Sequence, residues 1–287
     1  MRREIIDLYD AYTHTPLERR LFLQQLTAFA GSTTAAAALL PLLEANYARA
    51  AVVAANDARL RVTHITYPVA IGDMRAYLAR PKAATGKLPA IIVIHENRGL
   101  HQHIEDVTRR VALEGFLALA PDLLSIVGGT PANEDKARDM IGQLDSATAL
   151  KNLRATLMYL KQHPDCTGKV GSVGFCWGGG LCNELAASAP TLDAGVVFYG
   201  QVPASGTVAK IQAPLLLHYA GVDERINIAV PVYEEALKSA GKRYTLHWYE
   251  NVSHAFHNDT SEARYNADAA QLAWKRTMAF FHQHLKG

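Results

Sequence analysis

The chain has few cysteines, no concentration of charge and no long apolar segment. Its 287 residues include three cysteines, Cys166, Cys176 and Cys182, too few and too irregularly spaced for a disulfide framework or a zinc-knuckle site. Lys and Arg (29) nearly balance Asp and Glu (27), without the basic run typical of a nucleic-acid-binding face. No apolar run reaches the length of a membrane span. We therefore expect neither nucleic acid nor an integral membrane association.

The remaining composition is that of a globular protein, with 49% hydrophobic and 20% charged residues. We find no internal repeat, low-complexity tract or interdomain linker. The length permits one large domain or two small ones. We predict an N-terminal appendage over residues 1–54 and one domain over residues 55–287.

The N-terminal segment has two interpretations. Arg19 and Arg20 precede a mildly apolar stretch over 26–43, and small residues at 48–50 have cleavage-site spacing, which resembles a twin-arginine export signal. Glu44 and a long acidic region before the arginines are atypical of signals and favour a retained amphipathic helix. The first interpretation predicts a periplasmic protein and the second a cytoplasmic one. In both cases we place the segment outside the catalytic fold.

Strands and helices alternate along the rest of the chain. Alternating residues over 59–67 and 73–78 predict an antiparallel hairpin. Further strands are predicted at 88–95, 116–120, 170–173, 194–199, 214–219 and 244–249. Helices are predicted at 104–114, 134–143, 146–162, 181–187, 230–240 and 267–285. Such alternation implies crossover connections, so we predict an α/β fold with a mainly parallel, doubly wound sheet covered by helices on both faces.

A glycine-rich turn around Cys176 is the most informative motif. A β-branched run ends in Gly-Phe-Cys-Trp-Gly (174–178) and continues into strong helix formers. Glycines two before and two after Cys176 permit a sharp reversal that exposes its side chain. This is the nucleophile-elbow pattern with cysteine in place of serine. Glycine-rich turns also occur in nucleotide-binding folds, so the turn alone does not decide the function.

Two more residues follow strand ends, where reactive groups gather in parallel sheets. Asp223 lies beyond the strand 214–219, and His254 lies beyond the strand 244–249. The order nucleophile, acid, histidine is the one that α/β-hydrolases use. Glu224 and His257 are the nearest rivals for the acid and the base. The joint placement predicts Cys176 as nucleophile, His254 as base and Asp223 as orienting acid.

From about residue 67 the chain resembles the dienelactone hydrolase family (carboxymethylenebutenolidase-like) of the α/β-hydrolase superfamily. The matching segments are His-Glu-Asn-Arg-Gly-Leu (95–100), Gly-Phe-Cys-Trp-Gly-Gly (174–179), Asp223 in its glycine turn and Ser-His-Ala-Phe (253–256). The resemblance implies the same three catalytic roles. It also implies that Glu96 lies against the nucleophile and takes part in activating its thiol.

Cysteine as nucleophile narrows the reaction. The thiolate is the reactive form, and a helix N-terminus and a protonated histidine both lower the pKa of a thiol. We predict that the N–H groups of Trp177 and Asn97 stabilise the oxyanion. A thiolate leaves more readily than an amide nitrogen, so a peptide would mostly revert to substrate. We therefore predict a carboxylic ester or lactone hydrolase that forms a thioester.

The sequence specifies the substrate-binding residues less clearly than the catalytic ones. The best-known members of the family hydrolyse a lactone carrying a carboxylate that arginines hold, but Asn258 occupies a position where those enzymes tend to carry arginine. Arg98, Arg225 and His257 are candidate substitutes, and Tyr199 is a candidate lining residue. The pairs His101/His103 and His282/His284 lack a convincing ligand geometry. We predict no metal and no organic cofactor, with a small-molecule substrate as the partner.

Two other functions stay open at this point. Cys176 could act in thiol-redox chemistry with Cys182 or Cys166, although no close-pair redox motif is present. The fold could also belong to a binding protein without activity. The sequence is compatible with a homo-oligomer.

Overall fold

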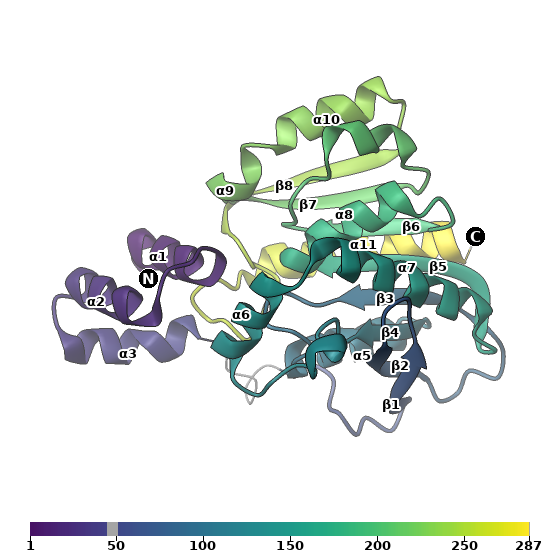
Figure 1. The fold of residues 1–287 in the computed structure, drawn as a ribbon, viewed down its shortest axis with the longest axis horizontal. Coiled ribbons are helices and arrows are strands. Elements are labelled where there is room, and N and C mark those ends of the chain that lie inside the picture. Colours follow the sequence, from purple (N-terminus) through teal and green to yellow (C-terminus); the bar gives the residue numbers. More distant parts are fainter. Residues whose placement is uncertain (45–50, 287) are drawn as a thin grey trace.

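The computed structural model describes residues 1–44 and 51–286 and contains one eight-stranded sheet, in the order β1-β2-β4-β3-β5-β6-β7-β8 (Figure 1). The strands are β1 (Leu60–Pro68), β2 (Asp73–Pro81), β3 (Leu88–Ile94), β4 (Leu117–Pro121), β5 (Cys166–Phe175), β6 (Ala194–Phe198), β7 (Leu215–Val222) and β8 (Tyr244–Ser253). β1 pairs with β2, and β2 with β4, in antiparallel fashion. The remaining neighbours are parallel.

Helices cover both faces of the sheet, as predicted. They are α5 (Gln102–Leu113), α6 (Glu134–Gln143), α7 (Ser146–Gln162), α8 (Trp177–Ser188), α9 (Glu224–Asn227), α10 (Val230–Ser239) and α11 (Ala267–Leu285), with short 3-10 turns at Ser125–Val127 and Ser205–Lys210. Because side chains alternate along a strand, Ile92 and Ile94 of β3 pack with α7, α8 and α10, whereas Ile91 and Val93 pack with α5 and α11. The buried apolar run of β3 thus contributes side chains to two hydrophobic cores, one on each face of the sheet.

The structure confirms most of the predicted elements and lengthens several of them, including β2, β7 and α8. α6, α7 and α11 have the predicted bounds. β5 begins at Cys166 rather than residue 170, and β8 continues to Ser253 rather than ending at residue 249. An irregularity in the pairing of β7 with β8 lets Val222 pair with Ser253. This extension brings the two residues that follow, Asp223 and His254, to neighbouring strand ends.

Among the described residues, three helices precede the sheet and lie together at one end of the molecule (purple in Figure 1): α1 (Arg3–His14), α2 (Arg19–Ala30) and α3 (Thr33–Leu43). Their buried apolar side chains form a small core of their own, in which Tyr12 stacks on Phe22 at 4.3 Å between ring centroids. They also bond to the rest of the chain, since the carbonyl of Leu43 accepts a hydrogen bond from Ser261 Oγ at 3.1 Å. The cleavage-site pattern at residues 48–50 lies outside the described residues.

None of the helices that the structure describes has, by itself, the length and apolar character needed to cross a bilayer. α2 and α3 meet those criteria only as a pair, with a bend of 113° between them.

Candidate active site

The turn between β5 and α8 holds Cys176 in the strained conformation that its glycines predict. The backbone of Cys176 has φ 55° and ψ −116°, and the residue caps the N-terminus of α8. A Cβ on Gly174 would lie 2.0 Å from the carbonyl oxygen of Gly178, and a Cβ on Gly178 would lie 2.4 Å from that of His95. Only glycine fits at both positions, so the elbow depends on them.

The ends of β7 and β8 bring the predicted acid and base together. Asp223 follows β7, His254 follows β8, and His254 Nδ1 donates a hydrogen bond to Asp223 Oδ2 at 2.5 Å. Both residues are buried. The bond leaves His254 Nε2 without a hydrogen-bond partner among the described residues. That nitrogen lies within 4.8 Å of Cys176 Sγ, so the three predicted residues share one site.

A second histidine, which the sequence reasoning missed, lies closer to the thiol. His14, the last residue of α1, has its Nε2 3.1 Å from Cys176 Sγ. Its Nδ1 lies 2.8 Å from the carbonyl oxygen of Asp10 and 3.1 Å from the Asp10 carboxylate. The expectation that the N-terminal segment stays outside the catalytic fold is therefore wrong for α1, which contributes a side chain to the site.

The charges around Cys176 favour its thiolate. Burial by itself would raise the pKa of the Cys176 thiol, but the facing imidazoles of His14 and His254 outweigh burial and lower this pKa to about 6. Burial would likewise lower the pKa of His14, but the Cys176 thiolate and Asp10 raise it above the ordinary value. Burial also opposes protonation of His254, whereas Asp223 and Cys176 raise its pKa well above 6.5. These shifts favour a thiolate that faces protonated imidazoles.

A cavity of about 590 Å³ opens beside Cys176. His14, Asn97, Trp177, Tyr199 and His254 are among the residues that line it. Tyr199 is buried with φ 41°, its ring lies 4.9 Å from that of His254, and its hydroxyl has no hydrogen-bond partner among the described residues. Trp177 begins α8, so its backbone N–H has no helical partner. The cavity therefore combines a thiol, free donors and an aromatic wall.

Glu96 lies beside this site but makes no described hydrogen bond to Cys176. Its Oε2 accepts a hydrogen bond from Asn258 Nδ2 at 2.7 Å, and its buried Oε1 has no partner among the described residues. Both side chains line a small cavity next to Cys176 and His254. Asn258, which stands where the family tends to carry arginine, is thus occupied by Glu96.

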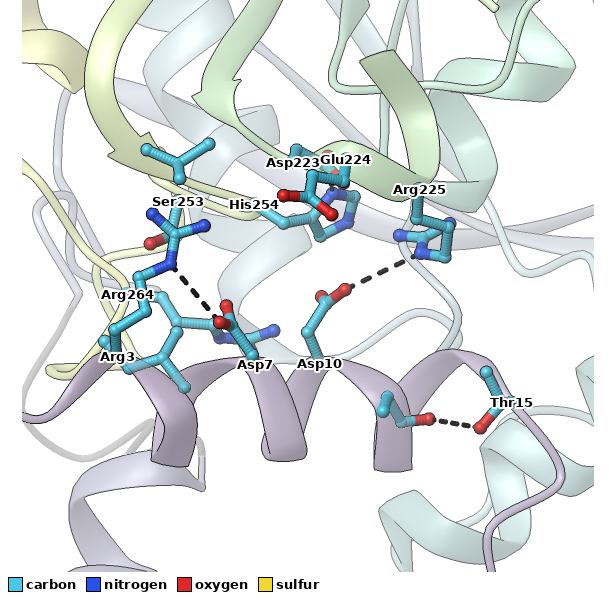
Figure 2. A pocket seen from close by; sticks show the side chains of 13 residues that line it. Arg3, Asp7, Asp10, Thr15, Asp223, Glu224, Arg225, Ser253, His254 and Arg264 are labelled. Atoms are coloured by element: carbon cyan, nitrogen blue, oxygen red, sulfur yellow. Dashed lines mark hydrogen bonds and ion pairs between the residues drawn. The ribbon is translucent and has the colours of Figure 1, made fainter. Parts of the chain in front are cut away.

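The three other predicted substrate residues differ in position. Arg98 lines the small cavity but pairs with Glu134 at 2.8 Å. Arg225 lines the large cavity, and together with His254, Asp10 and Asp7 it also lines a further cavity of about 340 Å³ (Figure 2).

His257 does not line the cavity that contains Cys176. The left-handed Ala255, with φ 63°, turns the chain after His254, and the imidazole of His257 stacks on Phe175 at 5.1 Å. Burial lowers the pKa of His257 to about 3. Because it is buried behind the strand ends, we no longer assign it to the substrate. Glu224, the alternative acid, begins α9 and lines the cavity of about 340 Å³ near Asp10 rather than the one beside Cys176.

One group among the described residues is compact enough to hold a metal ion, and it is His14, Cys176 and His254. Two imidazoles and a thiolate are donors that zinc accepts. Of the histidine pairs considered from the sequence, His103 instead faces Asp259 at 3.1 Å and His282 faces Glu114 at 3.7 Å. We keep the absence of a required metal as a prediction.

Comparisons with known proteins point to one family. The model described as "Dienelactone hydrolase family" matches residues 74–285. A "Putative carboxymethylenebutenolidase" of Methylorubrum extorquens is 34% identical over 246 residues, covering 80% of this chain and 84% of the relative. One of the same name from Synechocystis sp. is 35% identical and covers 79% of this chain and 98% of the relative.

A solved structure gives the same result. The crystal structure of a "Putative Dienelactone Hydrolase" from Klebsiella pneumoniae matches with a TM-score of 0.72 and 30% identity, covering 78% of this chain and 99% of that one. This likeness confirms the predicted α/β-hydrolase type of fold. The family match begins at residue 74, so α1 and its His14 precede the matched residues.

Proposed function

From the premise that the chain belongs to the dienelactone hydrolase family, we propose that it hydrolyses small esters or lactones with Cys176 as the nucleophile. The observation that supports this most is the position of Cys176. It combines an elbow conformation, a thiol pKa of about 6 and a cavity of about 590 Å³ at its sulfur. A thiol ionised at neutral pH and open to a cavity is a nucleophile ready for use.

Acylation begins when the Cys176 thiolate attacks the carbonyl carbon of the substrate. The carbonyl oxygen becomes an oxyanion, which the backbone N–H groups of Trp177 and Asn97 would stabilise. The intermediate collapses as the bond to the leaving oxygen breaks. His254 Nε2 donates its proton to that oxygen, so the alcohol, or the ring-opened end of a lactone, leaves neutral. The product of this step is a thioester on Cys176.

Deacylation uses the same histidine in the opposite direction. Neutral His254 takes a proton from a water molecule, and the resulting hydroxide attacks the thioester carbon. The second tetrahedral intermediate expels the Cys176 thiolate and releases the carboxylic acid. Asp223 holds Nδ1 of His254 throughout, which keeps Nε2 directed at the reacting atoms.

The nature of the nucleophile restricts the substrate. In the first intermediate the thiolate competes as a leaving group with the group that should depart. An amide nitrogen loses this competition, whereas an alkoxide or enolate leaving group wins it when it is stabilised. Activated esters and lactones are therefore the expected substrate class.

A negative charge on the substrate would meet Arg225 rather than Arg98. Arg225 lines the large cavity; its Nε faces the Asp10 carboxylate at 3.6 Å, but its Nη2 has no hydrogen-bond partner among the described residues. Arg98 is engaged with Glu134 and Tyr9. Because Asn258 is neutral and bonded to Glu96, a substrate carboxylate would bind in a different place from the family's usual one. The hydroxyl of Tyr199 is a second donor for the substrate.

Thiol-redox chemistry has less support. Cys182 is buried with its sulfur hydrogen-bonded to Ser172 Oγ at 3.1 Å, and burial raises the pKa of its thiol to about 11. Cys166 starts β5 and Cys176 follows its end, which separates the two by roughly 30 Å. Neither is suited to exchange with Cys176.

The decisive experiment replaces the nucleophile and a neighbouring cysteine in parallel. Cys176→Ala should lower the rate of p-nitrophenyl acetate hydrolysis by about 10³-fold or more, while Cys182→Ala, on the same helix but away from the cavity, should retain it. Mass spectrometry of the acid-quenched wild-type reaction should find one acyl group on Cys176. Undiminished hydrolysis by Cys176→Ala would exclude Cys176 as the nucleophile, and a fully inactive wild-type protein across an ester and lactone panel would favour a binding function.

A further inference from the structure

We propose that His14, held by Asp10, is a second catalytic histidine that keeps Cys176 as a thiolate and so leaves His254 free for the leaving group and for water. This proposal rests on the proposed role of Cys176 as the nucleophile. It assigns part of the active site to α1, a helix that precedes the residues matched by the family model.

The two histidines approach the sulfur in parallel arrangements. Each directs Nε2 toward Cys176 Sγ and Nδ1 toward an aspartate, Asp10 for His14 and Asp223 for His254. The rings pack edge to face with 4.7 Å between their centroids. The Asp223 carboxylate orients His254 through a hydrogen bond. The imidazole of His14 is oriented by its bond to the carbonyl oxygen of Asp10, and the Asp10 carboxylate, 3.1 Å from Nδ1, stabilises its protonated state.

The surroundings of His14 define its protonation. The carbonyl oxygen and the carboxylate of Asp10 both face Nδ1, and both can only accept. The Thr13 hydroxyl also lies 3.0 Å from Nδ1, but it donates its proton to the same Asp10 carbonyl, so Nδ1 carries a proton. With Nδ1 protonated, Nε2 either accepts the thiol proton of Cys176 as a neutral imidazole or, as an imidazolium, donates to the thiolate. His14 also ends α1, where the helix dipole favours a positive charge. The negative charge of the Asp10 carboxylate and the helix dipole both favour the second state, the ion pair.

The contact between His14 and Cys176 is supported by its surroundings, because three side chains from the rest of the chain contact the C-terminal part of α1. Asn97 Nδ2 donates to the carbonyl of Thr13 at 2.6 Å, and Arg138 Nη1 donates to that of Tyr12 at 3.1 Å. Arg225 Nε lies 3.6 Å from the Asp10 carboxylate, a pair visible in Figure 2. These bonds fix the residues on either side of His14 at the rim of the cavity.

A division of labour follows from this geometry. His14 Nε2 is directed at the sulfur at 3.1 Å, whereas His254 Nε2 has no hydrogen-bond partner among the described residues. During acylation His14 therefore keeps its proton and loses only its thiolate partner as the carbon–sulfur bond forms. The proton that reaches the leaving oxygen comes from His254, and the proton taken from water in deacylation returns there.

The test is the pH dependence of Cys176 reactivity in EDTA-treated protein. Iodoacetamide alkylation of Cys176 follows the thiolate fraction, so in the wild type it should be half-maximal near pH 6. His14→Gln keeps a donor but removes the charge, and it should move this midpoint up by about one pH unit or more. Asp10→Asn should shift it in the same direction by less. Asp7→Asn removes the same charge one turn earlier on α1 and should leave the midpoint unchanged.

Activity should change in the same pH-dependent way. For His14→Gln, kcat/KM for p-nitrophenyl acetate should fall about tenfold or more near pH 6 and return toward the wild-type value near pH 9, where the thiol ionises without help. A loss of equal size at every pH would indicate structural damage and overturn the proposal, as would an unchanged midpoint. If Cys176→Ala abolishes activity while His14→Gln retains the wild-type profile, only the second histidine is refuted. If His14→Gln does not fold, the Asp10→Asn midpoint decides.

Discussion

A methyl group on Gly178 should break the elbow. An alanine Cβ at this position would lie 2.4 Å from the carbonyl oxygen of His95 and 2.5 Å from that of Ile94. Both oxygens belong to the backbone at the end of β3, a buried strand paired on both sides, so neither can move aside as a side chain would. Restoring ordinary contact requires α8 to retreat from β3 by about 1 Å.

The size of the effect can be worked out from this displacement. Overpacking of this kind costs about 1–3 kcal/mol, against which the better helix propensity of alanine returns at most about 1 kcal/mol. A net loss of about 1–2 kcal/mol should lower the melting temperature by about 2–8 °C for a chain of this size. Moving the N-terminus of α8 also moves Cys176 and the N–H of Trp177, and a misplacement of about 1 Å can reduce kcat about 10²-fold.

Gly180→Ala is the matched control. It adds the same methyl group two residues later in α8, where the nearest atom is the Gln201 Cβ at 3.4 Å. We expect this variant to melt at or slightly above the wild-type temperature because only the gain in helix propensity applies. Melting followed by circular dichroism and kcat for p-nitrophenyl acetate measure both effects. A Gly178→Ala variant that melts and turns over like Gly180→Ala would refute the steric reasoning.

Two further predictions concern stability. Because the pKa of His257 is about 3 in the folded chain, the unfolded chain binds a proton below about pH 6.5 that the folded chain does not, so the free energy of unfolding decreases as pH falls through that range. Between pH 7 and pH 5, the free energy of unfolding measured in urea should fall by about 2 kcal/mol less for His257→Phe than for the wild type. Equal decreases in the two proteins would contradict this role of His257. The buried Asp106 accepts hydrogen bonds from the backbone of Val53 and from Arg110, so Asp106→Ala should cost about 3–5 kcal/mol in urea unfolding while kcat per alkylatable Cys176 stays unchanged, and a loss of kcat without a loss of stability would oppose a purely structural role.

The fold and three residues of the site could be predicted because their signals are local. The apolar run of β3 and the helical periodicity of α7 and α11 define elements without reference to partners. Gly174 and Gly178 mark the elbow through the backbone itself, since any side chain there would collide. Parallel strands then align their carboxyl ends, and this rule is sufficient to bring Asp223 and His254 to one edge.

His14 and Asp10 could not be predicted as site residues, because their positions depend on where α1 packs against the rest of the chain. The periodicity of α1 indicates that Ile5, Tyr9 and Tyr12 are buried, but no local pattern names the surface that covers them. The only indication in the sequence was that Asp10 belongs to the acidic region before the arginines, which is atypical of an export signal. His257 is the opposite case, a residue predicted to contact the substrate that does not line the cavity beside Cys176. The sequence does not show that Ala255 adopts a left-handed conformation and directs His257 away from His254.

The structure also constrains the export interpretation. Arg19, the first residue of the proposed twin-arginine motif, pairs with Glu44 at 3.0 Å and with Asp135 at 2.8 Å, and Phe22 and Leu26 are fully buried. Cleavage near residue 50 would remove these contacts together with His14. A mature enzyme without residues 1–50 would have only His254 to hold its thiolate, and its alkylation midpoint would resemble that of His14→Gln. Signal cleavage and a catalytic His14 therefore exclude each other, and the pH profile of the mature protein distinguishes them.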